Sequence, residues 1–251
     1  MKGAIIEARG VRLGTGRRDG LSFTVGAGEV VALPWGPGPR ATALLEAVAG
    51  LRRPAGGTVR VRGADPYEDR GGRRPGAVWR AGGWFPGLTA AEVVDGWRRW
   101  TLDPLPAAEA LRRTGLADRA DVRYERLDPG EQRMLDLSLA LVGRSDVLLL
   151  DEPTAGLGDA AADRVWRVLH ELAASGAAVL LTPRSPAEAR LADRVCGAAQ
   201  PARPGPHDTV HPADAHPDRP DAGTRAARRP DPRAGARRRR PLASARPGVP
   251  V

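Results

Sequence analysis

The chain is 251 residues long, 41% of its residues are hydrophobic, and its 39 basic and 30 acidic residues give a formal net charge of +9. A single cysteine excludes a disulfide framework and a cysteine-rich zinc site, and no apolar run approaches the roughly 18 residues that a membrane-spanning helix needs. Lys2 is the only lysine, which excludes any site that requires an interior lysine. The start of the chain lacks a signal-peptide pattern, so we expect a cytoplasmic protein.

Apolar runs and helical patterns alternate over the first 195 residues. Strands are predicted over residues 4–7, 21–25, 30–33, 58–62, 77–80, 147–150 and 178–182. Helices are predicted over residues 42–49, 90–100, 107–113, 131–142 and 159–173. The near-continuous Val and Leu of the last two strands is typical of a sheet that is buried on both faces. The alternation of strands and helices predicts an α/β fold with a mostly parallel sheet.

The composition changes near residue 200. Residues 201–251 contain 11 of the 24 prolines, and they carry 11 arginines against five aspartates. Such a segment cannot bury enough apolar surface to offset chain entropy, so we predict a domain over 1–195 and a disordered Pro/Arg-rich tail over 196–251. Cys196 lies at this change and is not expected to be reactive.

Two strand ends carry residues that suit a nucleotide site. The strand at 30–33 runs into a turn with Gly36 and Gly38 and then into a helix, which is where a phosphate-binding loop lies in open parallel sheets. The strand at 147–150 ends in Asp151 and Glu152. In nucleotide hydrolases the first acid belongs to the magnesium shell and the second orients the attacking water. For the isolated segment, an ordinary strand end is an equally good interpretation.

Four segments, in this order and spacing, resemble the nucleotide-binding subunits of ABC transporters over residues 1–195. They are 42–61 (TALLEAVAGLRRPAGGTVRV), 85–89 (FPGLT), 127–133 (LDPGEQR) and 150–157 (LDEPTAGL). The resemblance implies a P-loop NTPase-like fold with a helical subdomain at about 88–143, and ATP and Mg²⁺ as cofactors. It also implies a second nucleotide-binding subunit as dimer partner, and a permease that holds the chain at the inner face of the membrane.

The phosphate loop of this family corresponds to residues 35–42. The candidate nucleotide-binding residues there are Gly36, Gly38, Arg40 and Thr42. The loop departs from the family pattern because Trp35 and Arg40 replace glycines and Ala41 replaces the lysine. Glycines let backbone N–H groups curl around phosphate, and the lysine supplies positive charge. Arg40 offers a substitute charge, but we favour a turn that merely joins strand to helix.

The resemblance assigns the remaining site positions as well. They are Thr42 and Asp151 in the Mg²⁺ shell, Glu152 as the residue that orients water, and Asp128, Gly130 and Glu131 in the signature that faces the partner's γ-phosphate. The family's glutamine that monitors the γ-phosphate and magnesium is replaced by Arg80, and its switch histidine by Pro183. Asp128 replaces a serine, and a carboxylate there repels phosphate. The sequence therefore predicts weak ATP binding and no hydrolysis by the isolated chain.

Other functions stay open at this point. One alternative is a non-catalytic interaction protein on the same fold, or a decayed copy whose reading frame changes after codon 195. Another is nucleic-acid binding through the tail, with four arginines at 237–240, although the tail has no interleaved aromatics. Nucleic acid is therefore not an expected partner. His207, His211 and His216 have metal-ligand spacing, but a proline-broken segment does not preorganise ligands.

Four of the six tryptophans lie between the predicted strand at 77–80 and the end of the predicted helix at 90–100. They are Trp79, Trp84, Trp97 and Trp100. Core packing is the interpretation we favour. The alternative is an exposed docking groove for the permease, because aromatic residues are enriched in protein interfaces.

Overall fold

The computed structural model describes residues 3–14, 20–69 and 71–196. The chain divides into two units, Met1–Arg203 and Pro204–Val251, and every described residue belongs to the first unit. Apart from Cys196, the predicted tail lies outside the described residues, as do its three histidines and the arginines at 237–240. Among the described helices, none combines the length and apolarity needed to cross a membrane.

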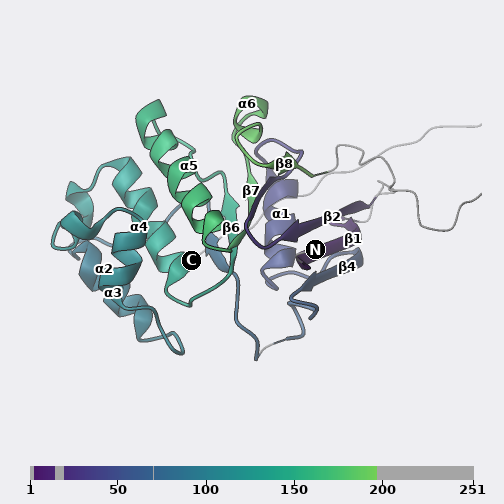
Figure 1. The fold of residues 1–251 in the computed structure, drawn as a ribbon, viewed down its shortest axis with the longest axis horizontal. Helices are drawn as coiled ribbons and strands as arrows, with labels where there is room; N and C mark the ends of the chain where they lie inside the picture. The colour runs from purple at the N-terminus through teal and green to yellow at the C-terminus, as the bar shows by residue number, and fades with distance from the viewer. Residues whose placement is uncertain (1–2, 15–19, 70, 197–251) are drawn as a thin grey trace, which may run out of the picture. The chain divides into compact units, whose positions relative to one another are not determined.

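Five strands form a parallel sheet in the order β5–β6–β7–β3–β8 (Figure 1). They are β5 (Gly76–Val78), β6 (Val147–Asp151), β7 (Ala178–Thr182), β3 (Glu29–Ala32) and β8 (Arg194–Val195). Every residue of β6 and β7 is buried, as their apolar composition indicates. The prediction of an α/β fold with a mostly parallel sheet is confirmed.

A second sheet is antiparallel and has three strands, in the order β2–β1–β4. They are β1 (Ala4–Arg12), β2 (Leu21–Gly26) and β4 (Gly56–Val61). Ile6 of β1 pairs with Val61 on one side and Val25 on the other, and all three side chains are buried. The sequence analysis did not separate these strands from the parallel sheet. Buried and exposed residues alternate at the end of β4, which is typical of a sheet covered on one face.

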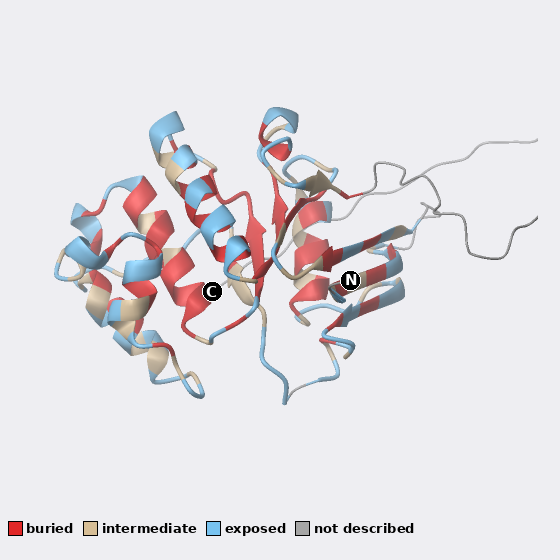
Figure 2. Ribbon diagram, viewed as in Figure 1, coloured by how far each residue is buried: buried red, intermediate tan, exposed pale blue. Residues whose placement is uncertain are grey.

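Helices cover both faces of the parallel sheet (Figures 1 and 2). They are α1 (Pro39–Val48), α2 (Ala90–Arg98), α3 (Ala107–Arg113), α4 (Pro129–Leu141), α5 (Asp159–Ala174) and α6 (Pro186–Ala189), with short 3₁₀ turns at Ala117–Arg119 and Tyr124–Arg126. Leu44 of α1 packs in one core cluster with Leu149 of β6 and Ile6 of β1, so α1 lies between the two sheets. Leu148 and Leu150 point to the opposite face and pack with α4 and α5.

Several boundaries differ from the sequence prediction, and three of them affect residues discussed below. Helix α1 begins at Pro39 rather than at 42, because the fixed φ and missing N–H of proline suit the first helical position. Helix α2 ends at Arg98 rather than at 100. Strand β5 ends at Val78, so Trp79 and Arg80 lie in the loop beyond it rather than in the strand. This last difference matters because it places Arg80 outside the sheet.

The interpretation of the tryptophans as core residues is wrong for three of the four. Trp84, Trp97 and Trp100 are 73%, 52% and 91% exposed. Trp79 is partly buried and packs against the core cluster that contains α1. Because α2 ends at Arg98, Trp100 follows the helix and the predicted helical face does not bury it.

Candidate functional site

The carboxyl ends of β6 and β7 meet the start of α1, and the two predicted strand ends come together there. Asp151 is the last residue of β6 and pairs with Thr182, the last residue of β7. The Thr42 hydroxyl on α1 donates a hydrogen bond of 2.7 Å to Asp151 Oδ2. Residues 109 positions apart therefore form one cluster at the edge of the sheet where open α/β folds bind ligands.

Both oxygens of Asp151 are engaged by threonine hydroxyls. Thr182 Oγ1 donates to Asp151 Oδ1 at 2.7 Å, and it accepts the backbone N–H of Glu152 at 2.7 Å. Asp151 is only 3% exposed, so these bonds replace the hydration that burial removes. The sequence analysis missed Thr182. Its signal is its position as the final residue of a buried strand that neighbours β6.

Glu152 faces Arg80, the residue at the family's glutamine position. Arg80 Nη1 lies 3.5 Å from Glu152 Oε1, and the glutamate side chain is 6% exposed while the arginine side chain is 64% exposed. Burial raises the pKa of Glu152, as do the Asp151 and Glu188 carboxylates to a smaller extent, while Arg80 opposes this shift. Glu152 therefore has a guanidinium beside it at the position that would orient water.

The backbone of Glu152 adopts a left-handed conformation, with φ of 48°. A non-glycine residue in this region is uncommon and is held there only when its surroundings determine it. The two hydrogen bonds from the Glu152 N–H, to the Thr182 hydroxyl at 2.7 Å and to the Thr182 carbonyl at 3.2 Å, supply that restraint. The β6–β7 pairing thus fixes the direction of the Glu152 side chain.

The turn before α1 is closed by stacking of two side chains. The Arg40 guanidinium lies 3.8 Å from the centre of the Trp35 ring, an attractive cation–π contact. Gly38 precedes the helix with φ of 151°, and no side chain caps the helix. Ala41 is fully buried in the core cluster, while Gly36 lies exposed in the turn. Arg40 therefore stacks on Trp35 in this structure. The favoured prediction of a turn that merely joins strand to helix, and the alternative that Arg40 substitutes for the lysine, both stay predictions.

The signature residues form the start of α4. Asp128 Oδ1 accepts the Glu131 N–H at 2.8 Å, and Glu131 Oε2 accepts the Asp128 N–H at 2.9 Å, which makes a reciprocal capping box. Glu131 also pairs with Arg119 at 2.7 Å. A side chain at Gly130 would place its Cβ 2.9 Å from the Cβ of Ala161, so close packing of α4 on α5 requires glycine there. These contacts give all three residues a structural role.

Two α4 residues anchor the loop that carries Arg80. Arg133 donates to the carbonyls of Trp79 and Arg80, at 2.9 and 3.0 Å. Asp136 Oδ1 accepts the Gly83 N–H at 3.0 Å, and burial raises the pKa of Asp136. Arg133 is only 8% exposed and lies 3.5 Å from Asp136. Neither residue was predicted to belong to the site, because a helical pattern does not show which loop an inward-facing charge contacts.

The loop after β7 is anchored by Glu188 of α6. The Glu188 carboxylate accepts the indole N–H of Trp166 at 3.1 Å and the backbone N–H of Arg184 at 2.7 Å, and it also accepts the hydroxyl of Thr154. Pro183, which the resemblance assigns to the switch-histidine position, is buried and has neither a side-chain donor nor a backbone N–H. Arg184 Nη1 donates to the Leu157 carbonyl at 3.2 Å. The sequence analysis did not identify Glu188.

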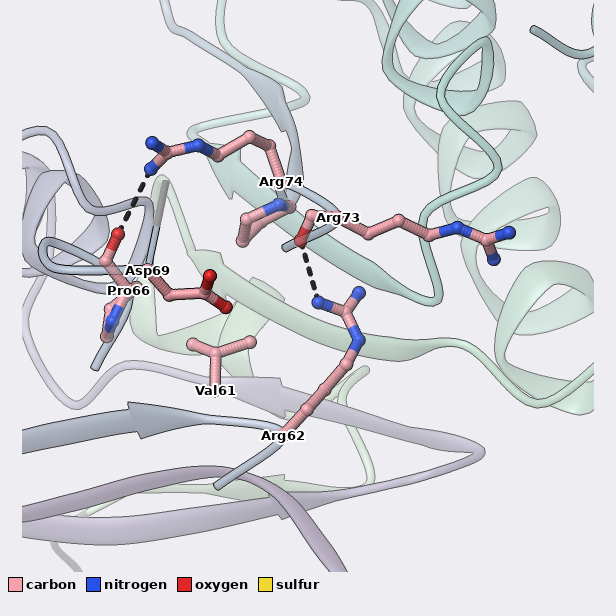
Figure 3. A pocket seen from close by; sticks show the side chains of 7 residues that line it. Val61, Arg62, Pro66, Asp69, Arg73 and Arg74 are labelled. Atoms are coloured by element: carbon pink, nitrogen blue, oxygen red, sulfur yellow. Dashed lines mark hydrogen bonds between the residues drawn. The ribbon is translucent and has the colours of Figure 1, made fainter. Parts of the chain in front are cut away.

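A small arginine-lined cavity lies away from this site, beside the linker between β4 and β5 (Figure 3). Its volume is about 20 Å³, which suits about one water molecule. Arg62 donates to the Arg73 carbonyl at 2.8 Å, and Arg74 donates to the Pro66 carbonyl at 3.0 Å (Figure 3). These arginines donate hydrogen bonds to backbone carbonyls of the linker, so we assign the cavity a structural role. In the described residues, no group of three His, Cys, Asp or Glu side chains is arranged to bind a metal.

Cys196 is expected to be unreactive in the folded chain. Its side chain is 1% exposed, and burial raises the pKa of its thiol to about 12. Thiol reagents attack the thiolate, and at pH 8 only about one thiol in 10⁴ with such a pKa is ionised. We expect labelling by a chromogenic disulfide reagent to be at least about 10²-fold slower in the native protein than in denaturant. Equal labelling rates in the two states would contradict this expectation.

Comparison with known proteins identifies relatives of the chain. The family model described as ABC transporter matches residues 18–155. Nod factor export ATP-binding protein I of Burkholderia lata is 37% identical over 186 residues, which are 71% of this chain and 61% of that protein. A daunorubicin/doxorubicin resistance ATP-binding protein of Streptomyces peucetius is 34% identical over 72% of this chain and 58% of its own length. The chain therefore spans about three fifths of each of these two relatives.

A third relative and two solved structures are matched over most of their length. A cytochrome c biogenesis ATP-binding export protein of Rhodopseudomonas palustris is 30% identical over 77% of this chain and 98% of its own. A dimeric bacterial ABC transporter cassette has a TM-score of 0.62 at 19% identity, and a cassette bound to ADP and Pi has 0.61 at 20%. Each of these matches covers 76% of this chain and 92% of the other. The chain therefore belongs to the ABC transporter family and has the fold of its ATP-binding cassettes.

Proposed function

We propose that the chain is the ATP-binding subunit of an ABC transporter, and that it binds nucleotide but does not hydrolyse it on its own. The observation that carries the second part is the contact of Arg80 with Glu152 at 3.5 Å, which pairs the water-orienting carboxylate with a cation. The ATP-binding role is shared by all three relatives named above. The names of these relatives indicate different cargoes, so the proposal is limited to the shared role.

Retained contacts support nucleotide binding at the edge of the sheet. The Thr42 hydroxyl and Asp151 remain joined at 2.7 Å, and Gly38 still precedes the first turn of α1. The start of a helix offers unpaired backbone N–H groups and a positive dipole to phosphate. The loss of the lysine at Ala41 weakens this attraction, so the expected binding is weak.

Three replaced positions argue against hydrolysis. Removing one donor that stabilises transition-state charge typically costs about 2.7–4 kcal/mol, or roughly 10²–10³ in rate. Here the lysine, glutamine and histidine positions hold Ala41, Arg80 and Pro183. Such losses do not add, but one or two of them already make turnover too slow to be useful. The arginine also holds Glu152 in an ion pair instead of leaving its carboxylate free for water.

Exposed apolar side chains support a protein partner, which we propose to be the permease. Trp84, Trp97, Trp100 and Leu102 are between 52% and 95% exposed and lie beside or within the helical region that contains α2. Exposed aromatic residues of this size mark interaction surfaces in soluble domains. Through such a partner the chain would lie at the inner face of the membrane, beside a second nucleotide-binding subunit. This assembly leaves hydrolysis to that second subunit.

The purified chain is expected to release no phosphate from ATP above the rate without protein, in the presence of Mg²⁺. The variant Glu152→Gln removes the acid that the resemblance assigns to orienting water, so it is the matched control for contaminating ATPases. We expect the two proteins to give the same rate in a phosphate-release assay. A metal-dependent rate in the native chain that disappears in Glu152→Gln would overturn the proposal of a non-hydrolysing subunit.

A further inference from the structure

Part of the expected Mg²⁺ shell is intact in this chain. Thr42 Oγ1 donates its proton to Asp151, and its oxygen lone pairs stay able to bind a cation. The Asp151 carboxylate lies beside it at the end of β6. These two residues would therefore supply oxygen ligands to a metal ion, as the family resemblance implies.

Arg80 does not fit that ion. Mg²⁺ requires oxygen ligands in near-ideal octahedral geometry, and a guanidinium has five N–H donors, no acceptor and a permanent positive charge. The residue thus removes an amide oxygen from the shell and adds a cation that repels the metal. Arg133 holds the backbone of Arg80 through a hydrogen bond of 3.0 Å to its carbonyl, and Arg80 Nη1 lies 3.5 Å from Glu152 Oε1.

An arginine at this point supplies the positive charge that the metal would otherwise bring to the phosphates of a nucleotide. Guanidinium groups bind phosphate oxygens in a bidentate manner, with charge-assisted hydrogen bonds. The Arg80 side chain is 64% exposed, so its other N–H groups are accessible to a ligand while Nη1 stays beside Glu152. Arg80 also follows β5 by two residues, and β5 pairs with β6, at whose end Thr42 contacts Asp151.

We propose that this chain binds nucleoside triphosphate without Mg²⁺, and that Arg80 takes the place of the metal as counter-charge to the phosphates. This inference rests on the proposed nucleotide binding and specifies in which ionic form the nucleotide binds. The free tetra-anion of ATP is the preferred ligand, rather than its Mg²⁺ complex. Removing the metal therefore leaves the affinity unchanged or raises it.

The test compares ATP binding to the full chain in excess EDTA and in excess Mg²⁺ by isothermal titration calorimetry. The native Kd in EDTA is expected to equal the Kd in Mg²⁺ within about twofold, or to be lower. In Arg80→Gln, which restores an amide oxygen and removes the charge, Mg²⁺ is expected to lower the Kd by about tenfold or more. Arg80→Lys keeps the cation and should stay indifferent to the metal. Arg167→Gln, on the exposed side of α5, is the matched control and should behave as the native chain.

Each outcome decides a separate statement. Native binding that needs Mg²⁺ would overturn the inference and leave the proposed nucleotide binding intact. An absence of binding in both buffers would overturn the proposed nucleotide binding and the inference with it. Metal indifference that persists in Arg80→Gln would overturn the role given to Arg80. Thermal unfolding of the variants, compared with Arg167→Gln, shows whether the substitutions leave the fold intact.

Discussion

Replacing Arg133 by alanine is expected to lower the free energy of unfolding by about 3–5 kcal/mol, the cost of breaking a buried ion pair by removing one partner. Arg133 is 8% exposed, and its loss leaves Asp136 buried without its cation. The carbonyls of Trp79 and Arg80 lose the hydrogen bonds from Arg133 at the same time, although the Trp79 carbonyl still accepts the Gly82 N–H at 3.1 Å. An unpaired buried polar group costs about 1–3 kcal/mol, so these losses support the upper part of the range.

Urea unfolding of the native and variant chains measures this difference. Arg167→Ala is the matched control, because it removes an exposed arginine from α5 and is expected to change stability by less than about 0.5 kcal/mol. The loop that carries Arg80 should also become more accessible to protease in Arg133→Ala. A stability loss equal to that of the control would show that the buried contacts of Arg133 contribute nothing to the fold.

The sequence predicts the strands that form the centre of the sheet, because their signal is local. Val and Leu fill 147–150 without interruption, and the acids that follow mark the strand end, so Asp151 and Glu152 are located by pattern alone. The antiparallel sheet is different, since the pairing of Ile6 with Val61 joins segments that are far apart in sequence. A periodic pattern identifies each strand but does not specify which neighbour it pairs with.

In the candidate site, too, the sequence locates single residues but does not predict their contacts. The position of Arg80 follows from the family resemblance, but its contact with Glu152 depends on a loop that Arg133 and Asp136 hold from another helix. In the sequence, those two residues cannot be distinguished from the exposed charges of an amphipathic helix. Their burial comes from tertiary packing, and no pattern in residues 129–141 predicts it.

Replacing Glu188 by alanine is the second substitution with a large expected effect, a loss of about 2–4 kcal/mol in the free energy of unfolding. The Glu188 side chain is 5% exposed and accepts hydrogen bonds from the indole of Trp166, the hydroxyl of Thr154 and the backbone of Arg184. Alanine leaves three donors in the interior without an acceptor. Water can accept from these three donors only if the segment between β7 and α6, which contains Pro183, opens.

Glu188→Gln separates the hydrogen bonds from the charge. Its amide oxygen still accepts from Thr154 and Trp166 and only the contact with the Arg184 N–H is lost, so we expect about half the destabilisation of Glu188→Ala in urea unfolding. Equal losses in the two variants would show that the negative charge, rather than the acceptors, holds this segment. The charge also acts on Glu152, whose pKa the Glu188 carboxylate helps to raise. Both variants should therefore lower the pKa of Glu152, which favours the ionised carboxylate beside Arg80. Only the alanine variant should loosen the segment after β7.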